Sequence, residues 1–214
     1  GSIRVTVGAG NVDVGGSVTV FAGQSTVSSG GGVAVASGYG TATSSGVISV
    51  LTDDAGDNGV SGALTFHSGT TSAGNSGAVL VTTGAATAGK GGSVTLAVGS
   101  GNTADGGSVS VEAGESTADS SAGGMVGIRA GFGSHATGGK GGAIEIHGGE
   151  GTSISGGAID VHSGYGSATS SGSITVHTVG AGDSGVSGRL SFSSGTASVG
   201  NSGSISLGSG ASTN

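Results

Sequence analysis

The stretch "GGSVTVFAGQSTVSS", Gly15 to Ser29, is followed at once by the similar "GGGVAVASGYGTATS", and the pattern continues along the chain. One glycine opens each repeat. These opening glycines are Gly16, Gly31, Gly46, Gly62, Gly77, Gly92, Gly107, Gly124, Gly142, Gly157, Gly172, Gly188 and Gly203. They lie 15 or 16 residues apart, except for spacings of 17 and 18 after Gly107 and Gly124. A flexible Gly/Ser linker has no reason to hold such a phase, so the sequence predicts a repeat array.

Two and four residues after each opening glycine stands an aliphatic or aromatic side chain. The pairs are Val18 and Val20, Val33 and Val35, Ile48 and Val50, Leu64 and Phe66, Val79 and Val81, Val94 and Leu96, Val109 and Val111, Val126 and Ile128, Ile144 and Ile146, Ile159 and Val161, Ile174 and Val176, Leu190 and Phe192, Ile205 and Leu207. Apolar residues two apart predict a strand with one buried face. A second glycine, such as Gly23 or Gly38, usually follows three residues later and predicts a bend.

One repeat alone buries too little apolar surface to offset the entropy of ordering its backbone. We therefore expect neighbouring repeats to stack strand on strand around a core of the aliphatic pairs. The predicted fold is all-β: one domain, residues 1–214, forming a thin parallel β-solenoid (β-helix) of about 13–14 turns of 15–16 residues. Small residues beside the bends, such as Ala22 and Ser37, predict two sheets that approach closely. The longer repeats predict protruding loops near Asp119–Ala122 and His135–Gly139.

A longer period lies over the short one. The stretch "SGYGTATSSGVISV" from Ser37 returns as "SGYGSATSSGSITV" from Ser163, an offset of 126 residues. With the same offset, "GVSGALTFHSGTTSAGNSG" from Gly59 returns as "GVSGRLSFSSGTASVGNSG" from Gly185. Because both ends keep the interior pattern, we expect the chain to be a segment of a longer array with this 126-residue super-repeat.

Several stretches carry a resemblance to a known group of proteins. "GVSGALTFHSGTTSAGNSG", "GAATAGKGGSVTLAVGSGNTADGGSV" and "GSHATGGKGGA" resemble the long Gly/Ser/Thr-rich repeat proteins of diatoms and related microalgae, which we expect to be β-solenoids. The resemblance covers almost the whole chain. It implies an exported protein, extracellular or at the cell surface, and it transfers no functional residue.

Composition excludes several function classes. The chain has 214 residues with 53 Gly, no Pro, Cys or Trp, only 5 Lys and Arg, and a net charge of −7. So few basic residues argue against binding to nucleic acid, and no apolar run is long enough to span a membrane. No Ser/His/Asp or Cys/His constellation has supporting context, so we predict neither an enzyme nor a cofactor.

Acidic residues cluster in "TDDAGDNG", Thr52 to Gly59, where Asp53, Asp54 and Asp57 offer oxygen ligands of the kind Ca²⁺ takes. The super-repeat places Val179 and Gly180 where Asp53 and Asp54 stand. A turn that needed the ion should keep its ligands in both copies, so the simpler interpretation is a solvated turn.

Histidines occupy the same position in three successive repeats: His147, His162 and His177. Glu145 and Asp160 precede two of them by two residues and so belong to the same face of the predicted strands. Stacked imidazoles could share a metal ion. The alternative is a row of neutral surface histidines with local charge pairing.

Hydroxyl side chains recur ten residues into the repeats. The members are Thr26, Thr41, Ser72, Thr87, Thr117, Thr152, Ser167 and Ser198, called here the hydroxyl column. The column could point inward as a hydrogen-bonded ladder or outward as a flat array, and the sequence leaves both open.

Two functions compete on these grounds. The first is a non-enzymatic structural or adhesive repeat protein, a rod or fibre module that associates with itself end to end or laterally. The alternative is an ice-binding (antifreeze) protein that uses a flat Ser/Thr-rich solenoid face. Ice, glycan and mineral surfaces are therefore further expected partners, whereas nucleic acid and membrane are not.

Overall fold

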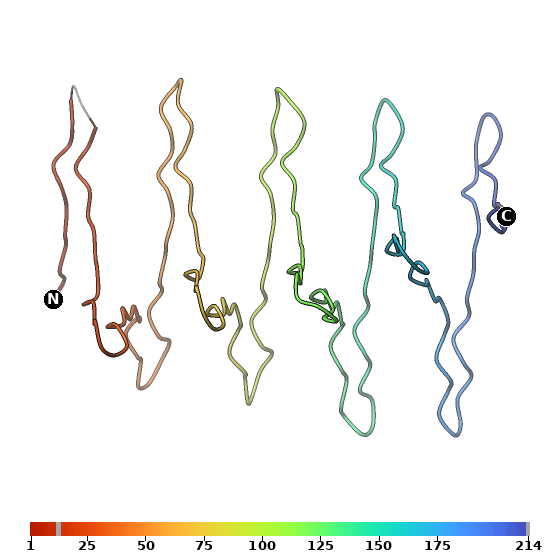
Figure 1. Ribbon diagram of the computed structural model, residues 1–214, viewed down its shortest axis with the longest axis horizontal. Helices are drawn as coiled ribbons and strands as arrows, with labels where there is room; N and C mark the ends of the chain where they lie inside the picture. The colour runs from red at the N-terminus through yellow and green to blue at the C-terminus, as the bar shows by residue number, and fades with distance from the viewer. Residues whose placement is uncertain (12–13, 213–214) are drawn as a thin grey trace. The chain divides into compact units, whose positions relative to one another are not determined.

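The computed structural model describes residues 1–11 and 14–212 and divides into two units, Gly1–Ser108 and Val109–Asn214. Within each unit, drawn-out segments alternate with narrow loops (Figure 1). We use "segment" for the seven residues that begin at an opening glycine, as in 16–22, and "loop" for the residues from there to the next opening glycine. That residues 1–214 form one domain stays a prediction, as does their place in a longer array.

The segments are not β-strands. Residues 1–11 and 14–212 contain no helix and no strand, so the prediction of an all-β parallel solenoid is wrong. Alternating aliphatic residues favour an extended backbone, but a strand also needs a ladder of hydrogen bonds to a neighbouring segment. Among the described residues, every backbone hydrogen bond joins groups at most 11 positions apart. The bonds thus close loops and turns and do not pair one segment with another.

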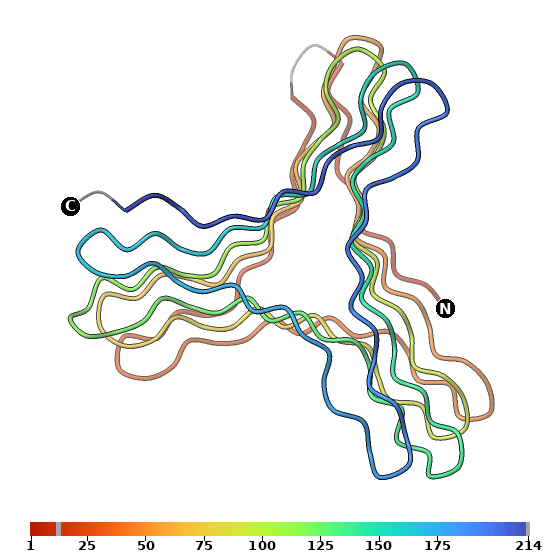
Figure 2. The ribbon, with the colours of Figure 1, turned by 90° about the vertical axis from the view of Figure 1, so that its right-hand side faces the viewer.

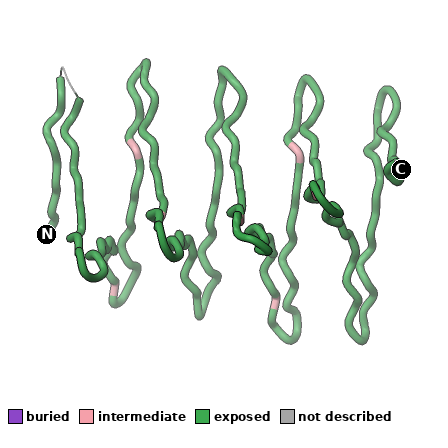
Figure 3. The backbone as a smooth tube through the Cα atoms, in the orientation of Figure 1, coloured by how far each residue is buried: buried purple, intermediate pink, exposed green. Residues whose placement is uncertain are grey.

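The aliphatic pairs do not form a core. No residue in the described part of the chain is buried (Figure 3). The first member of each pair exposes 49–63% of its surface and the second 60–101%. The predicted core is therefore wrong, because no second segment covers the apolar side of the first.

The loops are closed at their base by glycine backbone. The amide of an opening glycine donates to the carbonyl of the glycine at the preceding bend: the N···O distance is 2.8 Å from Gly124 to Gly114 and 2.9 Å from Gly31 to Gly23. The same bond closes five further loops, from Gly16 to Gly8, Gly46 to Gly38, Gly142 to Gly131, Gly157 to Gly149 and Gly172 to Gly164. We call this closure the neck. Beyond the neck, the loops form narrow lobes (Figure 2).

The neck explains why the opening residue is glycine. A Cβ atom on Gly124 would lie 3.2 Å from the Cβ of Ala113 and 3.2 Å from the amide nitrogen of Gly114. On Gly107 it would lie 2.7 Å from a methyl group of Val98. All thirteen opening glycines face the end of the preceding segment or the bend glycine in this way. The small residues beside the bends therefore serve the neck, whereas the sequence had assigned them to the contact between two sheets.

The two longer repeats place their extra residues in turns. One turn lies at residues 119–120, where the amide of Ser121 donates to the carbonyl of Ala118 at 3.4 Å. The other lies at residues 136–138, where the amide of Gly139 donates to the carbonyl of His135 at 3.0 Å. The expected loops at Asp119–Ala122 and His135–Gly139 are confirmed.

The 126-residue offset is visible in local geometry. Gly74 and Gly200, which stand 126 positions apart, are the two described glycines with positive φ, at 115° and 97°. Such angles favour glycine because other residues are strained there. The two copies also share a turn, closed from Gly59 N to Gly56 O at 3.1 Å and from Gly185 N to Gly182 O at 3.2 Å. The two copies thus share these two local conformations.

We predict that Gly124→Ala opens its loop. The added methyl group would crowd Ala113 and Gly114 and break the neck bond, which is worth about 1 kcal/mol, or about five-fold in amide exchange. Hydrogen exchange at position 124, followed by NMR, measures this. Gly114→Ala is the matched control, because a Cβ there meets nothing within 4 Å and the carbonyl is retained. Equal exchange in both variants would contradict the role of the neck.

Candidate functional site

The hydroxyl column lies at the loop tips. Seven of its eight members begin the bend at the tip of their loop, and Thr117 stands two residues before the turn at 119–120. All eight are exposed. Among the described residues, none of these hydroxyls hydrogen-bonds to another protein group. The column is therefore a set of eight exposed hydroxyls, each at or next to the tip of a different loop.

The residue before the column shapes the tip in at least two loops. The Ser25 hydroxyl accepts from the amide of Ser28 at 3.0 Å, and the Thr71 hydroxyl accepts from the amide of Ala73 at 3.3 Å. Ser and Thr commonly hold turns by such bonds to the backbone two or three residues on. The sequence analysis missed these two residues, although a hydroxyl directly before a predicted bend is the signal that finds them.

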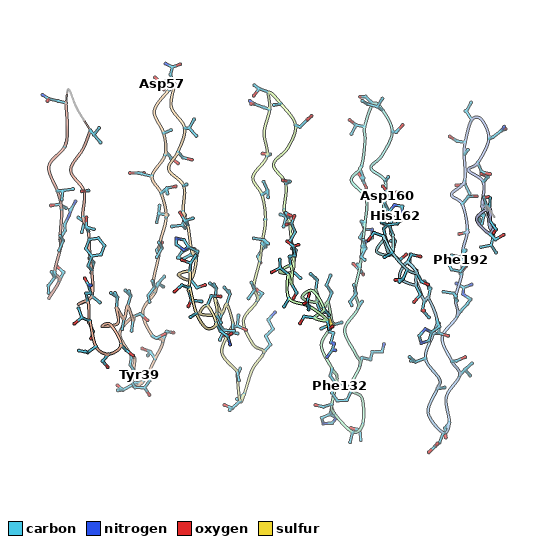
Figure 4. The ribbon with its side chains drawn as sticks, in the orientation of Figure 1. Tyr39, Asp57, Phe132, Asp160, His162 and Phe192 are labelled. Carbon is cyan, nitrogen blue, oxygen red and sulfur yellow. The ribbon has the colours of Figure 1, made fainter. Side chains whose placement is uncertain are left out.

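The acidic residues of the first unit make a local backbone contact. The amide of Asp54 donates to Oδ1 of Asp53 at 3.0 Å, and Asp57 lies in the turn at residues 57–58 (Figure 4). All three carboxylates are exposed. Their arrangement is that of a solvated turn in which one carboxylate holds the next amide.

The three histidines His147, His162 and His177 lie on separate segments. Nε2 of His147 is 3.9 Å from Oε2 of Glu145, and the two side chains are 80% and 77% exposed. His162 shares the next segment with Asp160 (Figure 4), and His177 stands on the one after it. An ion pair this exposed contributes little to stability. In residues 1–11 and 14–212, no three His, Asp or Glu side chains come together as a metal site would require.

The described part of the chain contains no cavity or pocket. The described residues also form no helix that could cross a lipid bilayer. What the molecule offers instead is surface: hydroxyls at the loop tips, and segments with one apolar side.

Comparison with known proteins adds no relative. No protein-family model matches the chain, and no curated protein or solved structure matches it either.

We predict that the acidic turn does not bind Ca²⁺ tightly. Exposed carboxylates that are not gathered around one point should give no saturable change in the NMR shifts of Asp53, Asp54 and Asp57 below about 1 mM Ca²⁺, the weak end of known protein sites. Asp53→Asn is the matched variant and should titrate like the parent chain. Saturation near 10 μM Ca²⁺ (roughly the sensor range) that Asp53→Asn abolishes would contradict this.

Proposed function

We propose that this chain is a non-enzymatic structural or adhesive repeat module that acts by associating along its length. One observation carries the proposal. The chain of 19.2 kDa exposes 20837 Å², whereas a compact monomer of that mass exposes about 8,400 Å² and an unfolded chain about 28,000 Å². A chain that buries so little of itself is suited to sharing surface with partners.

The exposed apolar side chains also support a role in association. Every side chain of the thirteen aliphatic pairs exposes at least 49% of its surface. Exposed apolar surface on this scale marks sites of protein association. Since the pairs recur every 15 or 16 residues, the contact would extend along the chain and would not be confined to one patch.

The setting of the ionisable groups also supports a non-catalytic role. Every Asp, Glu and His side chain among the described residues is exposed. Proton transfer and charge stabilisation in enzymes depend on groups held by preorganised, water-poor surroundings. An extracellular or cell-surface location belongs to the proposal and rests on the resemblance to the repeat proteins of diatoms and related microalgae.

Ice binding is not proposed as a second function. That alternative depended on a flat solenoid face, and the described residues contain no strand to form one. The column hydroxyls lie instead at the tips of separate loops.

We predict that the chain associates as its concentration rises. In a dilution series, sedimentation velocity should give 19.2 kDa at the lowest concentrations and progressively larger species above, because association covers the exposed aliphatic pairs. A shuffled chain of identical composition, without the 15-residue phase, is the control and should associate less. A mass that stays monomeric over the whole series, with no adsorption to surfaces, would contradict the proposed function.

A further inference from the structure

The two copies of the super-repeat share the turn closed by Gly59 and Gly185 and the positive φ of Gly74 and Gly200, but they differ in the chemistry of their segments. The six segments of the first unit that begin at Gly16, Gly31, Gly46, Gly62, Gly77 and Gly92 contain no Asp, Glu, Lys or Arg. Charges of this part of the chain stand in its loops, as at Asp54, Asp57 and Lys90. In the second unit, the segments themselves carry Glu112, Arg129, Glu145, Asp160 and Arg189.

Matched positions make the difference sharper. The third residue after the opening glycine is Thr19 in one segment and Glu145 in its counterpart 126 residues on. The next pair of segments has Ala34 and Asp160 at this position. Two residues further along, the first copy has Phe21, Ala36 and Leu51 where the second copy has His147, His162 and His177. At these five positions the second copy is ionisable and the first is neutral, whereas His67 of the first copy is matched by the neutral Ser193.

We propose that the first unit is the self-association surface, and that its occupant is the first unit of a second copy of this chain, paired segment to segment. This inference rests on the proposed function and names the partner and the contact. Loop tips and the segments of the second unit lie outside the contact.

Backbone groups make the segments competent to pair. Among the described residues, the backbone hydrogen bonds close necks and turns and link no two segments. An extended segment with free N–H and C=O groups can pair with the backbone of another chain. The addition of a strand to such an edge is a recurrent mode of protein recognition.

A second copy is the occupant that fits the spacing. Any partner must present apolar pairs every 15 or 16 residues, and the chain itself does so. In register, each aliphatic residue of one copy faces its equivalent in the other, the arrangement that stabilises paired strands. The surface that the chain exposes beyond that of a compact monomer is several times the roughly 1,600 Å² of a standard stable interface. Exposed surface is therefore ample for pairing.

Charge decides which unit pairs. Like charges directly opposite each other destabilise adjacent strands. In-register copies of the second unit would place Glu145 opposite Glu145 and Asp160 opposite Asp160, whereas the six segments between residues 16 and 98 bring no such pair together. Arg4 precedes these six segments and lies outside the proposed contact. Charged residues on extended segments are also a known device against edge-to-edge pairing.

The test compares two variants of the full chain, one with a new charge in the first unit and one with a new charge in the second. Thr95 and Thr175 occupy the same third position of their segments, and both are exposed. Sedimentation velocity in dilution series gives the concentration at half-assembly. Thr95→Glu should raise it about two- to five-fold, the effect of one unfavourable cross-strand pair, and 1 M NaCl should reverse much of the rise. Thr175→Glu and the neutral Thr95→Gln should leave it unchanged.

Hydrogen exchange provides the second measurement. As concentration rises, amides of segments between residues 16 and 98 should become protected while loop amides stay fast. Equal effects of Thr95→Glu and Thr175→Glu, or assembly that neither alters, would overturn the inference and leave the proposed function standing. Segment protection that does not depend on concentration would also overturn it, because the pairing would then lie within one chain. No assembly of the parent chain would overturn the inference, and no assembly together with no adsorption to surfaces would overturn the proposed function as well.

Discussion

The neck, where the chain passes within van der Waals distance of its own backbone, is the contact on which the rest of the structure depends. It favours a residue without a side chain at the opening position, because the residue just before the bend lies against that position. At Gly124 it combines a 2.8 Å hydrogen bond to Gly114 with a contact to Ala113.

The sequence predicted which residues take part in this contact, but not which parts of the chain the contact joins. The phase of the opening glycines, the bends and the small residues beside them could all be read from spacing, since glycine at a fixed phase implies a turn or a close approach. The extra residues near Asp119 and His135 were likewise placed in turns. What spacing does not reveal is which two parts of the chain approach: the contact at Gly31 closes a loop onto Ala22 and does not bring two sheets together.

Strand pairing and the core were wrong for a related reason. Alternation tells which side of Val18–Val20 is apolar, yet it contains no information on what covers that side. A solenoid, a lateral assembly and an open chain all share the pattern. The hydroxyl column could not be oriented for the same reason. The alternation of residues around Thr26 and its equivalents could not distinguish an inward ladder from exposed tips, because each interpretation assumed a core. The histidine row also assumed stacked segments, and without stacking His147 and His162 lie apart.

Local conformation and surface chemistry are separately encoded in this chain. The glycines that need a special backbone, Gly74 and Gly200, are the same in both copies. The exposed segment position changes from Phe21 to His147, while the loop that follows keeps its neck bond at 2.9 Å. Such freedom exists because no described residue is buried, so an exchange at a segment position disturbs no packed interior. In the proposed assembly, the free energy that orders the segments comes from contacts between chains, so order would depend on concentration. Under that condition, a few ionisable side chains on one unit suffice to direct association to the other.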